Sequence, residues 1–580
     1  MRKLIIVYTL LFLSVSHSAG QTRSSDLLNL MPAESIFLHL NTSLLFSGEQ
    51  LDFKIYCLNN LSENLSDLSK VAHIFLIGKN DKIIISRKIM LNNGTGQGDL
   101  IIPADLQTGS YKLYCFTNWM KNGSSENYFQ SDLRIINPYF PLPVENLQTN
   151  DKDSTPIQVE DITAETSKYA IPLQVSLDQK EVGKRQQVTI DFSVADASVL
   201  QGNYSLSVRS FAPIESPENS IISFQKAFVN RPDHYSNITT NNNLPEIRGR
   251  LISGKLRQKN DGTPAVRQKI ALSILNEDPL FQIATTDGNG QFYFNIERTT
   301  GNVNGFFQLI DDNWLNLELV MDEDQSSFGK ISFPEFKITE KLHDYILQRS
   351  IHNQIERSYA AIKEDSILKD GQLNPFKIAL PTRYVLDDFT RFRTIEETMI
   401  EVIERVFVIK KSGKRVFQVR QELGYDNPEL VPLVLVDGLY LKDHESFMDY
   451  GANKIKAISF SRKQFLYGSE YFQGILSFET IDGNFSEEYN SSEIQELTVA
   501  TAEPAKVYFD QEYSASTDDK SSRIPDFRNQ LLWLPEIDLQ TQKDKSFFTS
   551  DIIGTFEVVL KGFTAEGAPV EIRKYFTVSE

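Results

Sequence analysis

Apolar and polar residues alternate in short runs over most of the chain, and turn-forming residues separate the runs. Strands of this length between Gly- and Asn-rich turns are typical of an all-β sandwich. Turn signals include Ser47-Gly48 and Asn92-Asn93-Gly94. The pattern therefore predicts a β-sandwich domain over 21–141, with strands beginning at Glu34 and at 50–58, 72–78, 82–91, 98–103 and 110–119.

The same alternation returns after a stretch rich in Asp, Glu, Thr, Gln and Pro that has no hydrophobic period, predicted to be a linker at 142–168. Beyond it we expect three more β regions. They are a second β domain over 169–245, a third sandwich over 246–335 and a C-terminal sandwich over 486–580.

Helical periodicity is confined to a few places. Leu342 and Ile346 lie four residues apart, as do Ile351 and Ile355, which predicts a helical linker within 336–380 that joins the β modules to the next domain. A second helix is expected after Thr394, with Glu397 at the capping-box spacing.

Residues 433–483 combine both patterns. An apolar run ends at Asp437-Gly438, a short amphipathic piece follows, and two alternating strands meet at a Tyr467-Gly468 turn. This order predicts an α+β domain over 381–485. The expected fold class is thus mainly β, with tandem β-sandwich domains of macroglobulin or immunoglobulin type, one α+β domain and a linking helix.

Three segments resemble known modules. The first domain resembles the macroglobulin MG2-type domain of exported bacterial proteins, through FLHLNTSLLFSGEQLDFKIYCLN, NNGTGQGDLIIP and GSYKLYCFTNWMKN. The alternation in LQVSL, QVTIDFSV and YSLSVRSF predicts a second macroglobulin-like unit over 169–245. The Cys-Gly-Glu-Gln motif that builds the α-macroglobulin thioester does not occur in the sequence, so covalent trapping of proteases is not implied.

The stretch TTDGNGQFYFNI resembles the carboxypeptidase regulatory-like domain, a small sandwich, and LVLVDG followed by the YG turn and GILSFET resembles the plug domain of TonB-dependent outer-membrane receptors. Together with the MG2-type segment, this combination resembles multi-domain exported proteins of Bacteroidetes. It implies an envelope location and a partner such as a TonB-dependent barrel.

The net charge and the N-terminal residues limit the classes of ligand and the cellular location. The net charge of -18 and pI near 5.0 argue against binding nucleic acid, whose phosphates require a basic surface. Arg2 and Lys3 precede the apolar run Leu4–Val15, and small residues end the segment, which predicts a signal peptide over 1–20. No later stretch approaches the about 18 apolar residues of a membrane-spanning helix. We expect an exported protein that is periplasmic, outer-membrane-associated or on the cell surface.

The two cysteines, Cys57 and Cys115, both lie in predicted strands of the first domain. In an oxidising compartment they are candidates for a disulfide, worth about 4 kcal/mol for a loop of this length in the chain-entropy model. The alternative is a pair of buried, reduced core residues.

Motifs for catalysis or cofactor binding are absent from the sequence: there is no phosphate-binding loop, GxGxxG, HExxH or Cys-x-x-Cys. A calcium loop at Asp287 and Asn289 is disfavoured because position twelve is Arg298 rather than Glu. His444 next to Asp443 is expected at the surface. We therefore expect no catalytic residue, no cofactor and no metal.

One segment near the C-terminus mixes Arg with aromatic residues and forms a candidate partner-contact patch: Arg523, Asp526, Phe527, Arg528 and Trp533. The alternative interpretation is an internal clamp in which Arg side chains pair with carboxylates.

The sequence favours a non-enzymatic cell-envelope protein that binds protein or peptide partners at the outer membrane, because sandwich modules present loops and sheet edges to partners. Two alternatives stay open. A carbohydrate-binding protein would use an exposed tryptophan among Trp119, Trp314 and Trp533, and a hydrolase would assemble its active site between domains. The oligomeric state is not indicated.

Overall fold

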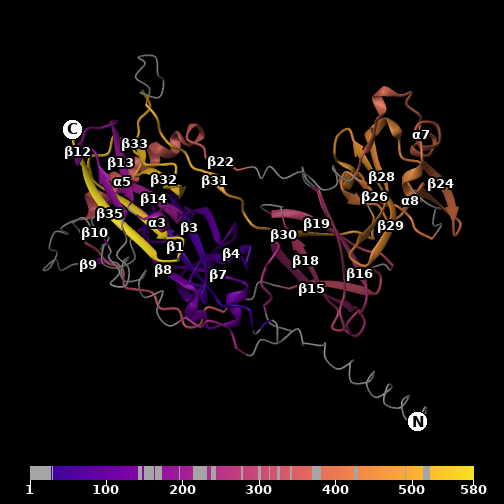
Figure 1. Ribbon diagram of the computed structural model, residues 1–580, viewed down its shortest axis with the longest axis horizontal. Coiled ribbons are helices and arrows are strands. Elements are labelled where there is room, and N and C mark those ends of the chain that lie inside the picture. Colours follow the sequence, from indigo (N-terminus) through magenta and orange to yellow (C-terminus); the bar gives the residue numbers. More distant parts are fainter. Residues whose placement is uncertain are drawn as a thin grey trace, which may run out of the picture. The chain divides into compact units, whose positions relative to one another are not determined.

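The computed structural model of the chain divides into two compact units (Figure 1). Unit 1 comprises Met1–Ile247, Ser326–Leu368 and Glu503–Glu580, and unit 2 comprises Arg248–Gln325 and Lys369–Ala502. The structure describes residues 28, 30–141, 147–148, 162–163, 173–194, 196–212, 231–236, 243–275, 279–297, 302–311, 314–322, 327–339, 342–368, 380–422, 429–489, 491–513 and 523–580. The predicted signal peptide, 1–20, lies outside these residues.

Unit 1 begins with the predicted sandwich. A three-stranded sheet in the order β1-β3-β6 faces a five-stranded sheet in the order β2-β8-β7-β4-β5. The strands are β1 (Glu34–Leu40), β2 (Leu44–Phe46), β3 (Gln50–Asn59), β4 (Val71–Ile77), β5 (Ile83–Met90), β6 (Thr95–Ile101), β7 (Gly109–Thr117) and β8 (Phe129–Ile136). The expectation of a sandwich at the N-terminus is confirmed.

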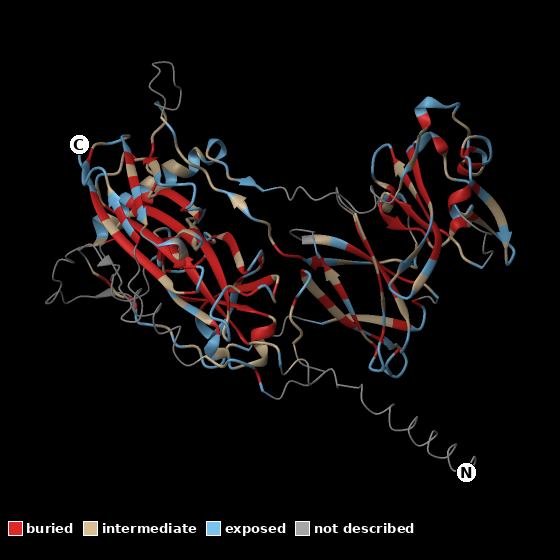
Figure 2. Ribbon diagram, viewed as in Figure 1, coloured by how far each residue is buried: buried red, intermediate tan, exposed pale blue. Residues whose placement is uncertain are grey.

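In the sheet β1-β3-β6, strands β1 and β3 are buried on both faces. Leu38 and Ile55 point into the sandwich core, while Phe37 and Tyr56, which lie opposite each other in β1 and β3, contact Phe563 of a later strand. As a result β1 and β3 are buried along almost their whole length (Figure 2). A strand covered on both sides shows no clean alternation of exposure, which is why this outer contact is hidden in the sequence pattern.

A second sandwich in unit 1 is built from segments that are far apart in the sequence. Its sheets run β10-β35-β34-β14-β32, with β12 beside β35, and β11-β13-β33. The elements are β10 (Ile162–Thr163), β11 (Leu173–Leu177), β12 (Glu181–Val182), β13 (Gln187–Val194), α3 (Ala197–Leu200), β14 (Asn203–Ser210), β32 (Gln530–Ile537), β33 (Asp544–Phe548), β34 (Gly554–Phe563) and β35 (Pro569–Val578).

The prediction of two separate domains at 169–245 and 486–580 is therefore wrong. Strand β14 pairs with β34 on one side and β32 on the other, and β13 pairs with β33. Neither segment holds enough strands to close a core alone, whereas the two together bury one continuous cluster that includes Leu206, Phe547 and Val558.

Charged side chains lie on the face of β14, β34 and β35 that is opposite this core. Arg209 and Arg573 both contact Glu557, and Lys561 contacts Glu571, with all five side chains at most 9% exposed. Buried charges are tolerated when they are paired. This layer makes the second sandwich polar where it meets the first one.

The helix α5 (His343–Ser358) belongs to unit 1. Its residues Tyr345 and Ile346 pack on a cluster around Phe46 and Ile136 of the first sandwich. The expectation of a helix that links the β modules to the α+β domain is corrected, because α5 ends at Ser358 and lies on the first sandwich. Ile351, which the sequence pattern places on the apolar face of this helix, is 46% exposed. Short strands complete the unit: β9 (Leu147–Gln148), β21 (Ile338–Thr339), β22 (Ser366–Ile367) and β31 (Lys506–Val507).

Unit 2 contains the third predicted sandwich, with sheets β18-β15-β20 and β17-β16-β19-β30. Its strands are β15 (Arg250–Gln258), β16 (Lys269–Ile274), β17 (Leu280–Thr285), β18 (Gln291–Ile296), β19 (Asn302–Leu309), β20 (Leu317–Met321) and β30 (Gln495–Ala500). The sequence pattern predicts that the residues of β30 belong to the C-terminal domain. This boundary is corrected, since β30 pairs with β19.

The α+β domain also lies in unit 2 and has the predicted order of elements. Its sheet runs β23-β28-β29-β26-β27. The elements are β23 (Thr382–Val385), α7 (Ile395–Glu401), β24 (Val406–Lys411), β25 (Lys414–Val419), β26 (Leu433–Val436), β27 (Leu439–Tyr440), α8 (His444–Met448), β28 (Ile455–Tyr467), β29 (Glu470–Thr480) and α9 (Phe485–Glu488). The capping box between Thr394 and Glu397 is confirmed.

Candidate functional site

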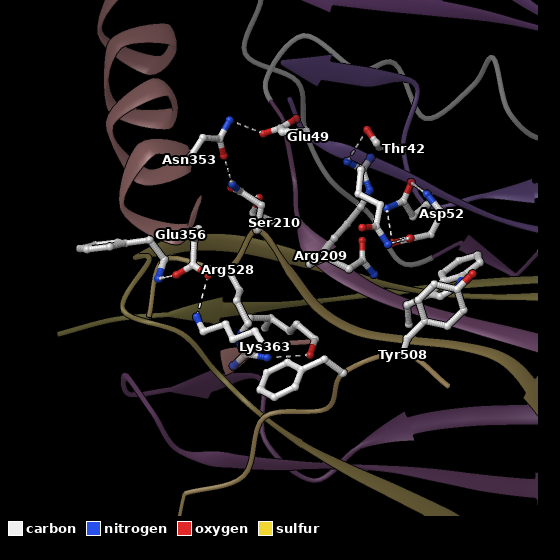
Figure 3. Close-up of a pocket in the computed structure, with 18 of the residues that line it drawn as sticks. Thr42, Glu49, Asp52, Arg209, Ser210, Asn353, Glu356, Lys363, Tyr508 and Arg528 are labelled. Carbon is white, nitrogen blue, oxygen red and sulfur yellow. Dashed lines mark hydrogen bonds and ion pairs between the residues drawn. The ribbon is translucent and has the colours of Figure 1, made fainter. Parts of the chain in front are cut away.

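A cavity of about 320 Å³ lies within unit 1. Its walls come from five segments: residues 41–52 around β2 and the start of β3, the end of β14, the helix α5 with the residues after it, the two residues after β31, and residues 527–533 at the start of β32 (Figure 3). Because both sandwiches and the helix contribute walls, the cavity exists only when unit 1 is fully assembled.

An ion pair holds the helix over the cavity. Nε and Nη2 of Arg349 donate to the two carboxylate oxygens of Glu49 at 2.9 Å each, and the Arg349 guanidinium lies 4.8 Å from the Phe46 ring centre. Burial would lower the pKa of Arg349, but Glu49 and Tyr345 outweigh burial and raise it. A bidentate pair of this kind fixes geometry as well as charge.

A second arginine of α5, Arg357, lies against the turn before β3. Gly48 has φ of +83°, in the left-handed region that favours glycine. A Cβ at Gly48 would lie 2.0 Å from Nη2 of Arg357, so the absence of a side chain makes room for this exposed guanidinium.

The opposite end of the cavity is acidic. Asp52, which is 5% exposed, accepts hydrogen bonds from Nδ2 of Asn41 at 3.0 Å and Nε2 of Gln50 at 2.8 Å. The same Gln50 nitrogen lies 3.5 Å from a carboxylate oxygen of Asp365, so one amide joins the two acids. Burial raises the pKa of Asp52 to about 8. Asp99 and Asp365 add to the rise, and Gln50 and Lys506 oppose it.

Two aromatic side chains form the wall beside these acids. The rings of Tyr508 and Trp533 are perpendicular, with centres 6.4 Å apart. Trp533 is 3% exposed. Within the part of the chain that the structure describes, neither Nε1 of Trp533 nor the buried hydroxyl of Tyr508 has a hydrogen-bond partner of normal geometry. Burial, followed by the charges of nearby carboxylates, raises the pKa of Tyr508, and a long hydrogen bond with the adjacent Trp533 side chain opposes the rise.

The structure divides the predicted partner-contact patch. Phe527, Arg528 and Trp533 line the cavity, whereas Asp526 is buried behind it and Arg523 is exposed outside it. Arg528 donates from Nε and Nη2 to the two carboxylate oxygens of Asp526 at 2.7 and 2.8 Å. Burial opposes ionisation of Asp526, yet Arg528 and Tyr513 lower its pKa to about 2. For this pair the geometry is that of the internal clamp.

Sequence reasoning missed the acidic end. Asp52 interrupts the apolar run of β3, and an acid at such a position signals either a buried partner or a site. Arg349 of α5 carried no signal, since a charged residue on a helix usually marks its solvated face.

Cys57 and Cys115 are both buried, free thiols in this structure, and both belong to the core of the first sandwich. Burial raises the pKa of each thiol. The arrangement is that of two reduced core residues, and the disulfide stays a prediction.

His39 and His444 are both buried. Nδ1 of His39 lies 2.7 Å from the Ser205 hydroxyl, but both residues are fully buried and cannot reach a substrate. His444, expected at the surface, is instead 6% exposed, and burial lowers its pKa to about 4. Its Nδ1 lies 3.3 Å from the backbone N–H of Phe417, which donates to it.

The carbohydrate alternative assumed an exposed tryptophan. Trp119, Trp314 and Trp533 are 0%, 5% and 3% exposed, so none offers a free ring face on the surface. The Asp287 carboxylate, considered as a calcium ligand, accepts hydrogen bonds from the backbone N–H groups of Asn289 and Gln291. Among the described residues no cluster of His, Cys, Asp and Glu has a metal-binding arrangement.

In the described parts of the chain, none of the helices combines the length and the apolar character needed to cross a membrane.

No family model matches the sequence, and no curated protein matches it significantly. Solved structures do show similarity at low identity. The trypsin-activated alpha-2-macroglobulin from Escherichia coli aligns over 94% of this chain and 42% of its own length, at 8% identity and a TM-score of 0.23. The Salmonella alpha-2-macroglobulin reacted with methylamine aligns over 94% and 39%, at 8% identity and a TM-score of 0.21.

A tetra-tandem repeat from the extending region of a large adhesion protein aligns over 94% of this chain and all of its own length, at 8% identity and a TM-score of 0.12. This chain thus spans less than half the length of the two macroglobulins. By its own strand topology it is a mainly β protein of packed sandwiches with one α+β domain.

Proposed function

We propose that this is a non-enzymatic protein of the bacterial cell envelope that binds a polypeptide partner through the cavity of unit 1. The observation that carries the proposal is the cavity itself. Many charged and amide side chains line it together with a smaller set of apolar and aromatic ones, such as Leu45, Phe527 and Trp533, so it offers a ligand both polar and apolar contacts.

The composition of the cavity supports binding rather than catalysis. Its arginines Arg349 and Arg528 are held in bidentate ion pairs, and none of the described residues that line it is a histidine or a cysteine. Groups fixed in this way hold a ligand in register without reacting with it.

Three predictions from the sequence belong to the same proposal. A signal peptide at 1–20 exports the chain, the segment 381–485 acts as a plug-like domain, and the partner is an outer-membrane or secreted protein, such as a TonB-dependent barrel. The order of strand, turn, helix and two strands in 433–480 supports the plug-like interpretation.

The experiment is a cross-linked pull-down of the tagged full-length protein from Bacteroidetes membranes. We expect an outer-membrane or secreted protein to be recovered, and recovery to fall when Gly48→Leu displaces Arg357 and narrows the cavity. A matched control is Gly413→Leu, at an open turn of unit 2 with a similar φ of +83°. Recovery of no envelope protein, or equal recovery with both variants, would contradict the proposal.

A further inference from the structure

Strands β24 and β25 of the α+β domain form a two-stranded ribbon that no other described strand extends. Six residue pairs join the two strands in regular register. Ser412 and Gly413 form the turn with φ of +49° and +83°, as in a type I′ hairpin. In such a hairpin the pair beside the turn, Lys411–Lys414, is hydrogen-bonded. Hydrogen-bonded and non-hydrogen-bonded pairs therefore alternate along the ribbon from that point.

The two edges of this ribbon differ. On β25 the backbone N–H of Phe417 points away from β24 and donates to Nδ1 of His444 in α8 at 3.3 Å. Phe417 lies opposite Val408, so this pair is a non-hydrogen-bonded one, in agreement with the alternation from the turn. The N–H and C=O groups of Val408, and of Lys410 two residues further on, consequently point away from β25. Helix α8 covers the edge of β25, and these four groups form the edge of β24.

The edge of β24 is open along part of its length. Among the described residues, β25 is the one strand that pairs with β24, and no backbone group of a turn or loop hydrogen-bonds to it. Phe407 is 45% exposed, Val408 and Ile409 are half-buried, and Lys410 is exposed, whereas Val406 is buried. The accessible edge therefore extends over residues 407–410.

Other edge strands of this protein are protected against further pairing. In the neighbouring sheet the edge strands β23 and β27 have four and two residues, and the edge strand β32 of unit 1 contains Pro535. Strand β24 has six residues, with neither a proline nor a bulge. Folded proteins usually shorten, bend or interrupt their edge strands, because an open edge accepts another strand. An edge without this protection is therefore suited to bind one.

The charges beside the accessible edge are positive. Lys410 is exposed and makes no ion pair with any described residue. Lys411 and Lys414 approach carboxylates only at 3.9 Å (Glu429) and 4.0 Å (Asp443). An acidic residue opposite Lys410 on an added strand would form a favourable cross-strand pair. The accessible edge of a second copy of this chain offers no acid for that position, so the charges favour a different partner.

We infer that β24 binds an extended segment of a partner polypeptide as a third, antiparallel strand of the ribbon, with an acidic residue opposite Lys410. The partner residues opposite Lys410 and Val408 exchange backbone hydrogen bonds with them. The partner side chains next to Phe407 and Ile409 lie on the face of the ribbon opposite the core, which contains Val406. The expected segment reads acidic, apolar, any residue, apolar from its amino end. The inference goes beyond the proposed function, because it concerns unit 2 and not the cavity of unit 1.

The test measures binding of the fluorescein-labelled peptide Gly-Ser-Glu-Val-Thr-Val-Ser-Gly to the full chain by fluorescence polarisation. In the inferred register its Glu lies opposite Lys410 and its Thr opposite Val408. The N–H groups of these two peptide residues point to β24, and those of the two Val residues point away. N-methylation of Glu or Thr should weaken binding at least about tenfold, whereas N-methylation of either Val should change it less than about threefold.

Two variants of the protein locate the interaction. Val408→Pro removes an outward N–H without breaking a hydrogen bond between β24 and β25, and it should abolish binding. Lys410→Glu should weaken binding of the peptide several-fold and strengthen binding of the same peptide with Lys in place of Glu. The matched control is Lys463→Glu, at an exposed lysine of β28, and should leave both affinities unchanged. Thermal unfolding of each variant shows whether unit 2 remains folded.

Three results would overturn the inference: no saturable binding of the peptide, equal weakening by N-methylation at all four positions, or full binding by Val408→Pro. Sedimentation velocity checks the second copy as the occupant. A monomer is expected, and a dimer that Val408→Pro dissociates would show that the edge serves self-association instead of a partner strand. These outcomes are separate from the pull-down, which tests the cavity of unit 1 through Gly48→Leu.

Discussion

Nδ1 of His39 in β1 lies 2.7 Å from the hydroxyl of Ser205 in β14, and this contact joins the two sandwiches of unit 1. The Tyr56 hydroxyl lies 2.8 Å from the same Ser205 oxygen. A hydrogen-bonded cluster that is wholly buried has strict geometry, so the two sandwiches are fixed in register at this point.

Protonation of His39 should weaken unit 1. Burial, followed by the positive charges of Lys561, Arg573 and Arg209, lowers the pKa of His39 well below 6.5. The unfolded chain therefore binds a proton below pH 6.5 that the folded chain does not. The stability contributed by neutral His39 is complete above pH 6.5 and is lost as pH falls, by about 1 kcal/mol between pH 6.5 and 5.5.

Urea unfolding of the wild type and His39→Gln at pH 7.5 and 5.5 checks this expectation. The variant should be less stable at pH 7.5, yet lose less stability than the wild type on acidification. The same loss in both proteins would show that another group controls the acid response.

Removing one partner of the Asp526–Arg528 pair should be costly. In Arg528→Met the buried Asp526 carboxylate keeps only Lys363, at 3.3 Å, as a cation partner within the described residues, so unfolding free energy should fall by about 3–5 kcal/mol. The double variant Asp526→Asn/Arg528→Met should recover part of the loss. Arg523→Met, at an exposed position, is the control and should stay within about 0.5 kcal/mol of wild type. Equal effects at both arginines would rule out the internal clamp.

Cys57 and Cys115 should be detectable as thiols only after unfolding. Both are buried, and their raised pKa values suppress the reactive thiolate. We expect no alkylation of the folded protein by iodoacetamide and two modified cysteines after denaturation without reductant, as measured by intact mass. A denatured protein with no reactive thiol would instead establish the disulfide.

A chain that ends at Asn529 should lose the second sandwich. Strand β14 would then have neither β32 nor β34 beside it, and β13 would lack β33. Hydrogen exchange should show loss of protection in β11, β13 and β14. Strands β4 and β7, which pair with each other inside the first sandwich, serve as the internal control and should stay protected. Protection of β14 in the truncated chain would contradict the shared core.

Sequence reasoning succeeded where neighbouring strands are also neighbours in space. Strands β4 and β5 follow each other in sequence and pair, as do β7 and β8, so period and turn residues locate them. The same reasoning failed for the second sandwich because Ser207 pairs with Trp533 across most of the chain. Alternation gives the face of a strand but not the identity of its partner.

The site shows the same division. The segment with Phe527, Arg528 and Trp533 stood out because it mixes arginine with aromatic residues, and it does line the cavity. Asp52 and Arg349 could not be assigned to the cavity from the sequence, because the residues around them come from segments that are far apart in the chain.

Photo-cross-linking in living cells tests the central claim most directly. The photo-reactive residue p-benzoylphenylalanine replaces Arg357, an exposed residue that lies against Gly48 and lines the cavity. We expect this variant to form a cross-link to an envelope or secreted polypeptide. The same probe at Gln354, also exposed on α5 but outside the cavity lining, should give none. No adduct from Arg357, or identical adducts from both positions, would contradict polypeptide binding at this cavity.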